Sequence, residues 1–314
     1  MQMQSIKKRN KNLKGWLFYG ALISLPLLQF CIMYLYVNFN SLVMAFKSYD
    51  LNTNSWEWVG FANFKSLFYD IKTLPELTYG FKNSLVSWAI GLVISFPVGL
   101  FFAYYIFKGF MFSKAFRILL FVPSVISVSI LTIIFKYYAE TFMPQILNSL
   151  LGTKFRGFLS NKNTVFATIM FFNIFIGFGV SVLMYTGAMN GIAESVIEAG
   201  KLDGVNTVQE FFLIVFPQIV GTVSVFLVTG IAGIFTNQLN LYSIFHSEAH
   251  PRVYTIGYYL YKTIQQSTSY AQYPYCAALG SLVATIIIPV ILLVLWILNK
   301  LDPLENSNEK IKQK

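Results

Sequence analysis

Long apolar segments alternate with short polar segments along the whole 314-residue chain. The apolar segments are continuous and do not alternate residue by residue, so they predict helices rather than strands. A helix needs about 20 apolar residues to cross the hydrocarbon core of a bilayer. The segments that predict membrane spans are residues 16–44, 83–107, 116–137, 164–188, 211–235 and 276–299. We therefore expect an all-α membrane protein built as a six-span helical bundle.

The composition supports this interpretation. The chain is 56% hydrophobic and only 11% charged, whereas soluble domains carry roughly a quarter charged residues. Many Tyr and Trp residues lie near the ends of the predicted spans, as in the aromatic belts of membrane proteins. The net charge of +10 fits basic residues at the cytoplasmic membrane edge better than nucleic-acid binding. The expected surroundings are membrane lipid, with no nucleic acid.

The distribution of basic residues predicts the orientation. The N-terminal head carries only basic charges, at Lys7, Lys8, Arg9, Lys11 and Lys14, and such flanks stay in the cytoplasm. The second outer loop is an exception, because four basic residues face only Glu140 there. The first flank usually dominates, so we expect both termini, including a tail over 301–314, to be cytoplasmic.

Charged residues are scarce within the predicted spans. Apart from Arg117 and Lys136 at the two ends of the third range, the six ranges contain no Asp, Glu, Lys or Arg. Ion-coupled carriers and voltage sensors usually need such charges, which disfavours an ion-coupled carrier or channel. The sequence also has no phosphate-binding glycine loop and no convincing nucleophile or carboxylate pair. We expect a protein that is not an enzyme and holds no metal.

The most patterned polar segment is the loop over residues 189–210. Glu194, Glu198 and Lys201 recur at helical spacing on one face, while Ile192, Val196 and Ala199, flanked by Ala193 and Ile197, recur on another. The pattern predicts a short amphipathic helix that rests its apolar face against the bundle. The loop has four acidic residues and one Lys, which disfavours lipid binding, so a protein partner is the better interpretation.

The end of this loop carries further signals. Asp203-Gly204 predicts a turn, because glycine accepts the left-handed backbone that ends a helix. Thr207 and Glu210 have the spacing of a capping box for the following helix. Pro217 lies one or two turns inside that helix, where it allows a bend.

These residues resemble a known signature. Glu198-Ala199, Gly204, Ile214 and Pro217 match the pattern Glu-Ala-Ala, three residues, Gly, nine residues, Ile, one residue, Leu-Pro. The chain is similar here to permease subunits of binding-protein-dependent ATP-binding-cassette (ABC) importers. It departs at Phe216 and at Gly200, where glycine in place of alanine destabilises the short helix by up to about 1 kcal/mol. Segments 81–85, 123–127, 145–152 and 191–199 resemble the sugar-permease branch of the maltose and glycerol-phosphate type.

The resemblance implies a fold, partners and site residues. The fold would be that of a type I importer permease with a cytoplasmic coupling helix, in a bacterial cytoplasmic membrane. A separate ATPase dimer would bind ATP and Mg, so this chain would bind no cofactor. A second permease subunit and an extracytoplasmic solute-binding protein would complete the assembly. The residues implied in ATPase coupling are Glu198, Ala199, Gly200, Asp203, Gly204, Ile214 and Pro217.

The resemblance also suggests a division of the chain and a substrate. The basic head is 1–15, the first span with its outer loop is 16–82, the permease core is 83–300, and the tail is 301–314. Uncharged spans suit a neutral polar solute such as a sugar, and the resemblance implies a carbohydrate, specifically an oligosaccharide. The candidate path residues are Asn173, Gln218, Asn237 and Gln238, whose amides can bind hydroxyl groups.

Several alternatives remain open. The four amides can equally join helices through interhelical hydrogen bonds, and we expect Gly177 and Gly179 to permit close helix packing. The basic second outer loop fits either anionic sugars or a contact with the binding protein. The whole architecture would also suit another small solute, and a membrane scaffold would use the loop only for docking.

Overall fold

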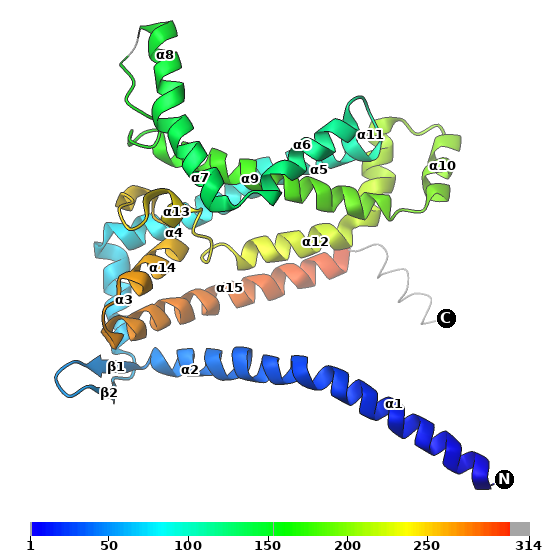
Figure 1. Cartoon of the computed structure of the whole chain (residues 1–314), viewed down its shortest axis with the longest axis horizontal. Helices are drawn as coiled ribbons and strands as arrows, with labels where there is room; N and C mark the ends of the chain where they lie inside the picture. Colours follow the sequence, from blue (N-terminus) through cyan, green and yellow to red (C-terminus); the bar gives the residue numbers. More distant parts are fainter. Residues whose placement is uncertain (1, 153, 302–314) are drawn as a thin grey trace. The chain divides into compact units, whose positions relative to one another are not determined.

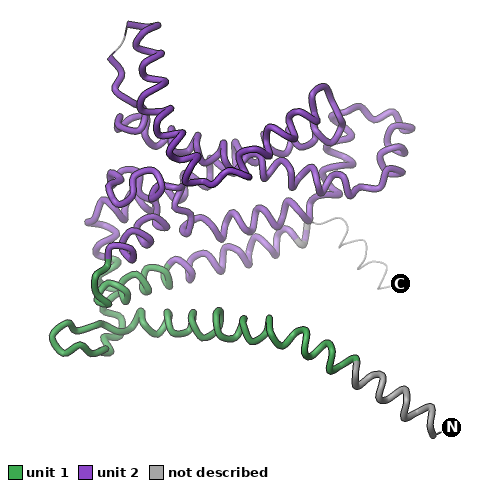
Figure 2. Tube along the Cα trace, viewed as in Figure 1, with its two compact units in different colours: residues 1–68, 267–282 green, residues 69–266, 283–314 purple. Residues whose placement is uncertain are grey.

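The computed structural model describes residues 2–152 and 154–301. These residues are almost entirely helical, which confirms the predicted all-α class. They form two compact units, one made of residues up to 68 with 267–282 and the other of 69–266 with the segment from 283 onward (Figure 2). The predicted tail lies outside the described residues, except for Leu301.

Within the described ranges, five helical segments are long and apolar enough to cross a membrane: Gly15–Met44, Pro75–Phe107, Val165–Asn190, Thr207–Ala232 and Tyr270–Leu298. They confirm five of the six predicted spans. The second begins earlier than predicted, since Pro75 occupies the first turn, where its missing N–H costs nothing.

Each of these segments is built from the helical elements seen in Figure 1. The first comprises α1 (Gln2–Gln29), η1 (Phe30–Tyr36) and α2 (Val37–Met44), and the second comprises α4 (Pro75–Ile90), η2 (Gly91–Ser95) and α5 (Phe96–Phe107). The others are α9 (Val165–Asn190); α11 (Thr207–Gln209), η4 (Glu210–Val215) and α12 (Phe216–Ala232); and η6 (Tyr270–Gln272) with α15 (Tyr273–Leu301). Apart from the 3₁₀ turn η6, these η elements are short π-helical segments.

The third predicted span is broken. The prediction of one continuous helix over 116–137 is wrong, because α6 (Ser113–Val125) and α7 (Val128–Tyr137) meet at a bend of 100°. Ile126 takes an extended conformation at the break, and Pro123 leaves the last turn of α6 without one of its ladder hydrogen bonds. Counting this bent pair as a single span brings the total for the described residues to six.

The helix continues past α7 through η3 (Tyr138–Phe142) and α8 (Met143–Leu151). Lys136 lies in the last turn of α7, as expected, and its Nζ donates to the backbone oxygen of Ile244 at 3.3 Å.

The first unit contains a small hairpin that the sequence did not predict. Strands β1 (Lys47–Asp50) and β2 (Ser55–Trp58) pair antiparallel, and the rings of the opposed Tyr49 and Trp56 lie 4.9 Å apart. The Asp50 carboxylate accepts hydrogen bonds from Asn52 N (2.9 Å) and Thr53 Oγ1 (3.0 Å) in the turn. These bonds hold the pKa of Asp50 below its usual value. Helix α3 (Ala62–Thr73) follows the hairpin.

The second unit packs α5 and α6 against α9. Gly179 of α9 lies against the backbone oxygen of Leu120 in α6 so closely that a Cβ would overlap it, whereas a Cβ added at Gly177 would meet no other segment of the described chain within 4 Å. The prediction of close packing is therefore confirmed for Gly179, whereas Gly177 packs closely against no helix of the described residues.

At one end of this unit lie α13 (Leu241–Phe245), η5 (Pro251–Val253) and α14 (Ile256–Gln266). Asn83 Nδ2 fastens this end to α4 by donating to the backbone oxygens of Arg252 (2.8 Å) and Tyr254 (2.9 Å). Helix α10 (Glu194–Leu202) lies at the opposite end of the unit (Figure 1).

Candidate functional site

The loop between α9 and α11 contains the predicted short helix, α10. Its C-terminus has the hydrogen bonds of a Schellman motif, because Val205 N donates to Gly200 O (3.2 Å) and Gly204 N donates to Lys201 O (3.1 Å). Gly204 has a φ of +77°, the left-handed conformation that only glycine adopts easily. The predicted glycine turn is confirmed.

The face of α10 that packs against the rest of the unit differs from the expected one. Ile197 and Gly200 are buried, while Val196 and Ala199 are exposed and Leu202 is 89% exposed. The prediction that Val196 and Ala199 rest against the bundle is therefore wrong. The helical pattern alone did not reveal that η4 packs against α10 beside Gly200.

Acidic and apolar side chains consequently share the outer surface of the loop. We name as the docking face the exposed residues Val196, Glu198, Ala199, Leu202 and Asp203. Exposed apolar residues beside carboxylates are typical of a surface that a protein partner covers.

Two signature residues contact each other across the loop. A Cβ on Gly200 would overlap the Cδ1 atom of Ile214, so glycine lets α10 approach η4 more closely than alanine would. Pro217 lies in the first turn of α12, directly after the π-helical segment η4. The spacing of the signature therefore reflects the folding of the loop onto the start of the span 207–232.

The cap of α11 lies one residue earlier than predicted. Asn206 Oδ1 accepts from Gln209 N (2.9 Å), and Gln209 Oε1 accepts from Asn206 N (3.0 Å), which makes a complete capping box. The prediction of Thr207 and Glu210 as the box is wrong.

Glu210 has a different role. Its side chain is buried, both carboxylate oxygens lie 2.9 Å from Lys108 Nζ, and Oε1 lies 3.2 Å from the Tyr104 hydroxyl. Sequence reasoning missed this ion pair, since the partners are 102 residues apart.

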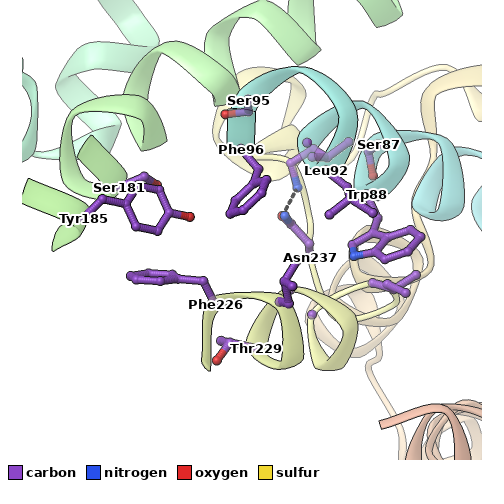
Figure 3. Close-up of a pocket in the computed structure, with 16 residues that line it drawn as sticks. Ser87, Trp88, Leu92, Ser95, Phe96, Ser181, Tyr185, Phe226, Thr229 and Asn237 are labelled. Carbon is purple, nitrogen blue, oxygen red and sulfur yellow. Dashed lines mark hydrogen bonds between the residues drawn. The ribbon is translucent and has the colours of Figure 1, made fainter. Parts of the chain in front are cut away.

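A cavity of about 410 Å³ lies among α4, η2, α9, α12 and the segment after α12. Figure 3 shows the rings of Phe96, Tyr185 and Phe226 directed toward one another, and the centroids of the last two lie 4.9 Å apart. Trp88 and several hydroxyl groups complete the wall, and none of its lining residues is Asp, Glu, Lys or Arg. The polar side chains that line it are Ser87, Ser95, Ser181, Tyr185, Thr229 and Asn237.

Of the four amides expected along a substrate path, only Asn237 lines this cavity. Its Oδ1 accepts from Leu239 N at 2.8 Å. Gln218 is exposed and Gln238 is half-buried, and neither lines this cavity.

Asn173 lies in a hydrogen-bond network between segments. Its Nδ2 donates to Ile169 O (2.9 Å) and Leu239 O (2.8 Å), and its Oδ1 accepts from Asn240 Nδ2 (2.8 Å). These bonds join α9 to the segment after α12. Asn173 therefore fits the alternative in which the amide joins helices rather than binds substrate.

A second cavity, of about 360 Å³, lies among α7, η3, the loop after α8 and the segment from α13 to η5. Lys136, Lys162 and Arg252 reach it from three separate segments, and His250, Glu140 and Glu248 also line it. Glu140 holds the loop after α8, because it accepts from Leu159 N (2.6 Å), Ser160 N (2.8 Å) and Ser160 Oγ (2.5 Å). Two of the four basic residues of the second outer loop, Lys136 and Lys162, thus meet Arg252 at one site.

The apolar helices, the uncharged cavity between them and the loop at one end define a multi-span membrane transport component. The family described as "Binding-protein-dependent transport system inner membrane component" matches residues 95–305. The chain belongs to this family and is a permease subunit of an ABC transporter, which confirms the resemblance seen in the sequence.

The chain is also similar to individual permease proteins of ABC transporters. The chain is 28% identical over 296 residues to the probable ABC transporter permease protein YesP of Bacillus subtilis (strain 168), covering 92% of this chain and 91% of the relative. It is 24% identical over 292 residues to the arabinooligosaccharides transport system permease protein AraP of the same organism, covering 89% and 90%. It is 22% identical over 285 residues to the multiple sugar-binding transport system permease protein MsmF of Streptococcus mutans, covering 90% and 94%.

Solved structures support the fold. A chain of a bacterial ABC transporter involved in the import of the acidic polysaccharide alginate superimposes with a TM-score of 0.72, 22% identity and coverage of 96% of this chain and 99% of that chain. A chain of a bacterial alginate ABC transporter, in a complex with an alginate pentasaccharide-bound periplasmic protein, gives a TM-score of 0.74, 23% identity and coverage of 94% and 98%.

Proposed function

We propose that this chain forms half of the translocation pathway of an ATP-driven importer for a carbohydrate, specifically an oligosaccharide. The observation that carries the proposal is the uncharged cavity of about 410 Å³, walled by aromatic rings, hydroxyl groups and one amide. Aromatic faces can stack on sugar rings, and hydroxyl and amide groups can bind sugar hydroxyls. The names of the relatives AraP and MsmF support the same substrate class.

The energy would come from a separate ATPase dimer that holds ATP and Mg, while this chain has no catalytic role. The docking face on α10 is the proposed contact, with Glu198, Ala199, Gly200, Asp203, Gly204, Ile214 and Pro217 forming or shaping it. ATP binding would stabilise one global state of the assembly over another, which is the requirement for coupling between sites. A second permease subunit and a solute-binding protein would complete the importer. The solved alginate transporter in complex with a periplasmic protein supports this composition.

The orientation follows from the same assembly. The loop with α10 would face the cytoplasm, and both termini would lie on that side of a bacterial cytoplasmic membrane. The basic N-terminal head supports this orientation.

A second candidate for the substrate is a saccharide that carries carboxylates. The cavity lined by Lys136, Lys162 and Arg252 favours it, because these three cations from separate segments outnumber the two carboxylates in the same wall. The other use of these cations is to bind acidic residues of the solute-binding protein. A comparison of neutral and uronate oligosaccharides of equal length distinguishes the two uses, since only substrate binding depends on the charge of the sugar.

The test is uptake into proteoliposomes that contain the full assembly, with labelled neutral and uronate oligosaccharides. Trp88→Ala removes an aromatic wall of the cavity and should lower the uptake rate about tenfold, the equivalent of about 1.4 kcal/mol. The matched control is Phe171→Ala, which removes an exposed ring on α9 that lies outside this cavity. Equal uptake by the Trp88→Ala variant and the wild type, or transport of another solute and of no carbohydrate, would contradict the proposal.

A further inference from the structure

The loop over residues 189–210 carries the docking face, and we name it the docking loop. A buried polar cluster connects this loop to the wall of the cavity. Glu210 is 4% exposed and accepts from Lys108 Nζ with both oxygens at 2.9 Å. The Tyr104 hydroxyl lies 3.2 Å from Glu210 Oε1 and 3.0 Å from the backbone oxygen of Thr207. We name Tyr104, Lys108 and Glu210 the inner link.

The inner link joins two spans at the end where the loop lies. Tyr104 belongs to α5 and Lys108 is its C-terminal cap residue, while Thr207 and Glu210 begin the span that follows the loop. The ring of Phe211 packs on that of Tyr104 with centroids 5.0 Å apart. The contact between α5 and the start of the span 207–232 therefore has both a polar and an aromatic part.

Each end of this connection leads to a functional element. Toward the loop, Ile214 lies about one turn after Glu210 and contacts Gly200 of α10. In the other direction, the continuous helix Pro75–Phe107, which Lys108 caps, carries Trp88 and Phe96 in the wall of the cavity. The inner link thus lies between the proposed site of ATPase docking and the proposed path of the substrate.

A buried ion pair is suited to this position. A carboxylate with little exposure is costly unless it is paired, and removal of one partner leaves an uncompensated charge. Separation of the two helices at this point would therefore be costly. The hydrophobic packing around them is less directional, since it depends on apolar area.

We propose that the inner link is the rigid connection through which displacement of the docking loop moves the span 75–107 and, with it, the cavity wall. Tyr104, Lys108 and Glu210 are positioning residues in this proposal, and they contact neither the sugar nor the ATP. The proposal rests on the proposed function, because it assigns a route between the two sites of that function.

The experiment measures sugar taken up per ATP hydrolysed by the full assembly in proteoliposomes. The central variant is the double substitution Lys108→Met with Glu210→Leu, which removes both charges while keeping similar volume. Replacing a buried ion pair by apolar residues is often neutral for stability, so the assembly should form and unfold as the wild type does. We expect ATP hydrolysis to continue while the ratio of uptake to hydrolysis falls about tenfold.

The matched control is Lys114→Met, which removes an exposed cation at the start of α6 and should leave the ratio unchanged. The single variant Glu210→Gln should lower both the ratio and the thermal stability, because it leaves Lys108 without its counter-charge. A purely structural role predicts a loss of stability in the single variants and a wild-type ratio in the double variant. That result would overturn the proposal.

If the double variant does not assemble, the same ratio of uptake to hydrolysis is measured for Tyr104→Phe, which removes a single hydroxyl from the inner link. A normal assembly with a ratio lowered severalfold supports the proposal, and an unchanged ratio overturns it. The wild-type assembly separates this outcome from the proposed function. Failure of the wild type to import any carbohydrate contradicts the proposed function, whereas normal import with an unaltered ratio in the variants contradicts the inner link alone.

Discussion

At the scale of single residues, local backbone chemistry was predictable and long-range pairing was not. Gly204 follows Asp203 at the end of a helical pattern, and this local signal correctly predicted the turn. Glu210 has a local signal of equal strength as a capping residue, yet Lys108 and Tyr104 bind it instead. Capping depends on neighbours within four residues, whereas an ion pair across 102 residues depends on how the helices pack.

The conformation of Gly204 leads to a prediction for the docking face. In the substitution Gly204→Ala, the added Cβ has free space, but the φ of +77° costs about 1–2 kcal/mol for any other residue. We expect the Schellman motif to loosen and the affinity for the ATPase subunit, measured by binding to the purified complex, to fall by about tenfold.

Gly187→Ala serves as the control for that substitution. Gly187 also has nothing within 4 Å of an added Cβ, but it lies within α9 and has no positive φ. Its substitution should leave the affinity unchanged. A Gly204→Ala protein that binds the ATPase as tightly as this control would rule out a role for the turn in docking.

At the scale of elements, the length of each apolar run predicted the spans, and breaks within the runs were less visible. Five runs formed the expected helices because their backbone groups can only be satisfied internally in a bilayer. The third run bends by 100° after Val125, and Pro123 is the only obvious sequence signal for that bend. The hairpin Lys47–Trp58 escaped prediction because two strands of four residues are too short for their alternation to be distinctive.

The contact between α6 and α9 gives a prediction at this scale. Gly179→Ala would push its Cβ into the backbone oxygen of Leu120, so the helices must separate. Overpacking of this kind costs typically about 1–3 kcal/mol, and we expect a lower midpoint of thermal unfolding in detergent. Gly177→Ala, two residues away and facing open space, should be neutral or slightly stabilising, since alanine favours a helix by about 1 kcal/mol over glycine. Equal midpoints for the two variants would show that α6 does not pack against Gly179.

At the scale of the whole molecule, the orientation in the membrane can be measured directly. Leu202→Cys would place a thiol on the docking face, and Asn52→Cys would place one in the exposed hairpin turn. In a background with Cys31 and Cys276 replaced by alanine, a membrane-impermeant maleimide should label position 202 only in inside-out vesicles and position 52 only in right-side-out vesicles. Addition of the ATPase subunit should protect position 202. Labelling of position 202 from the outer side would contradict both the orientation and the proposed docking.

The class, most of the spans and the family were predictable from the sequence, because these depend on run length, composition and short-range spacing. The exposed face of α10, the amide that lines the cavity and the partner of Glu210 became visible only in the folded chain. Each of these depends on contacts between segments far apart in the chain. The residue pattern of a single helix indicates that the helix has two different faces. Which of these faces is buried depends on the neighbouring helices.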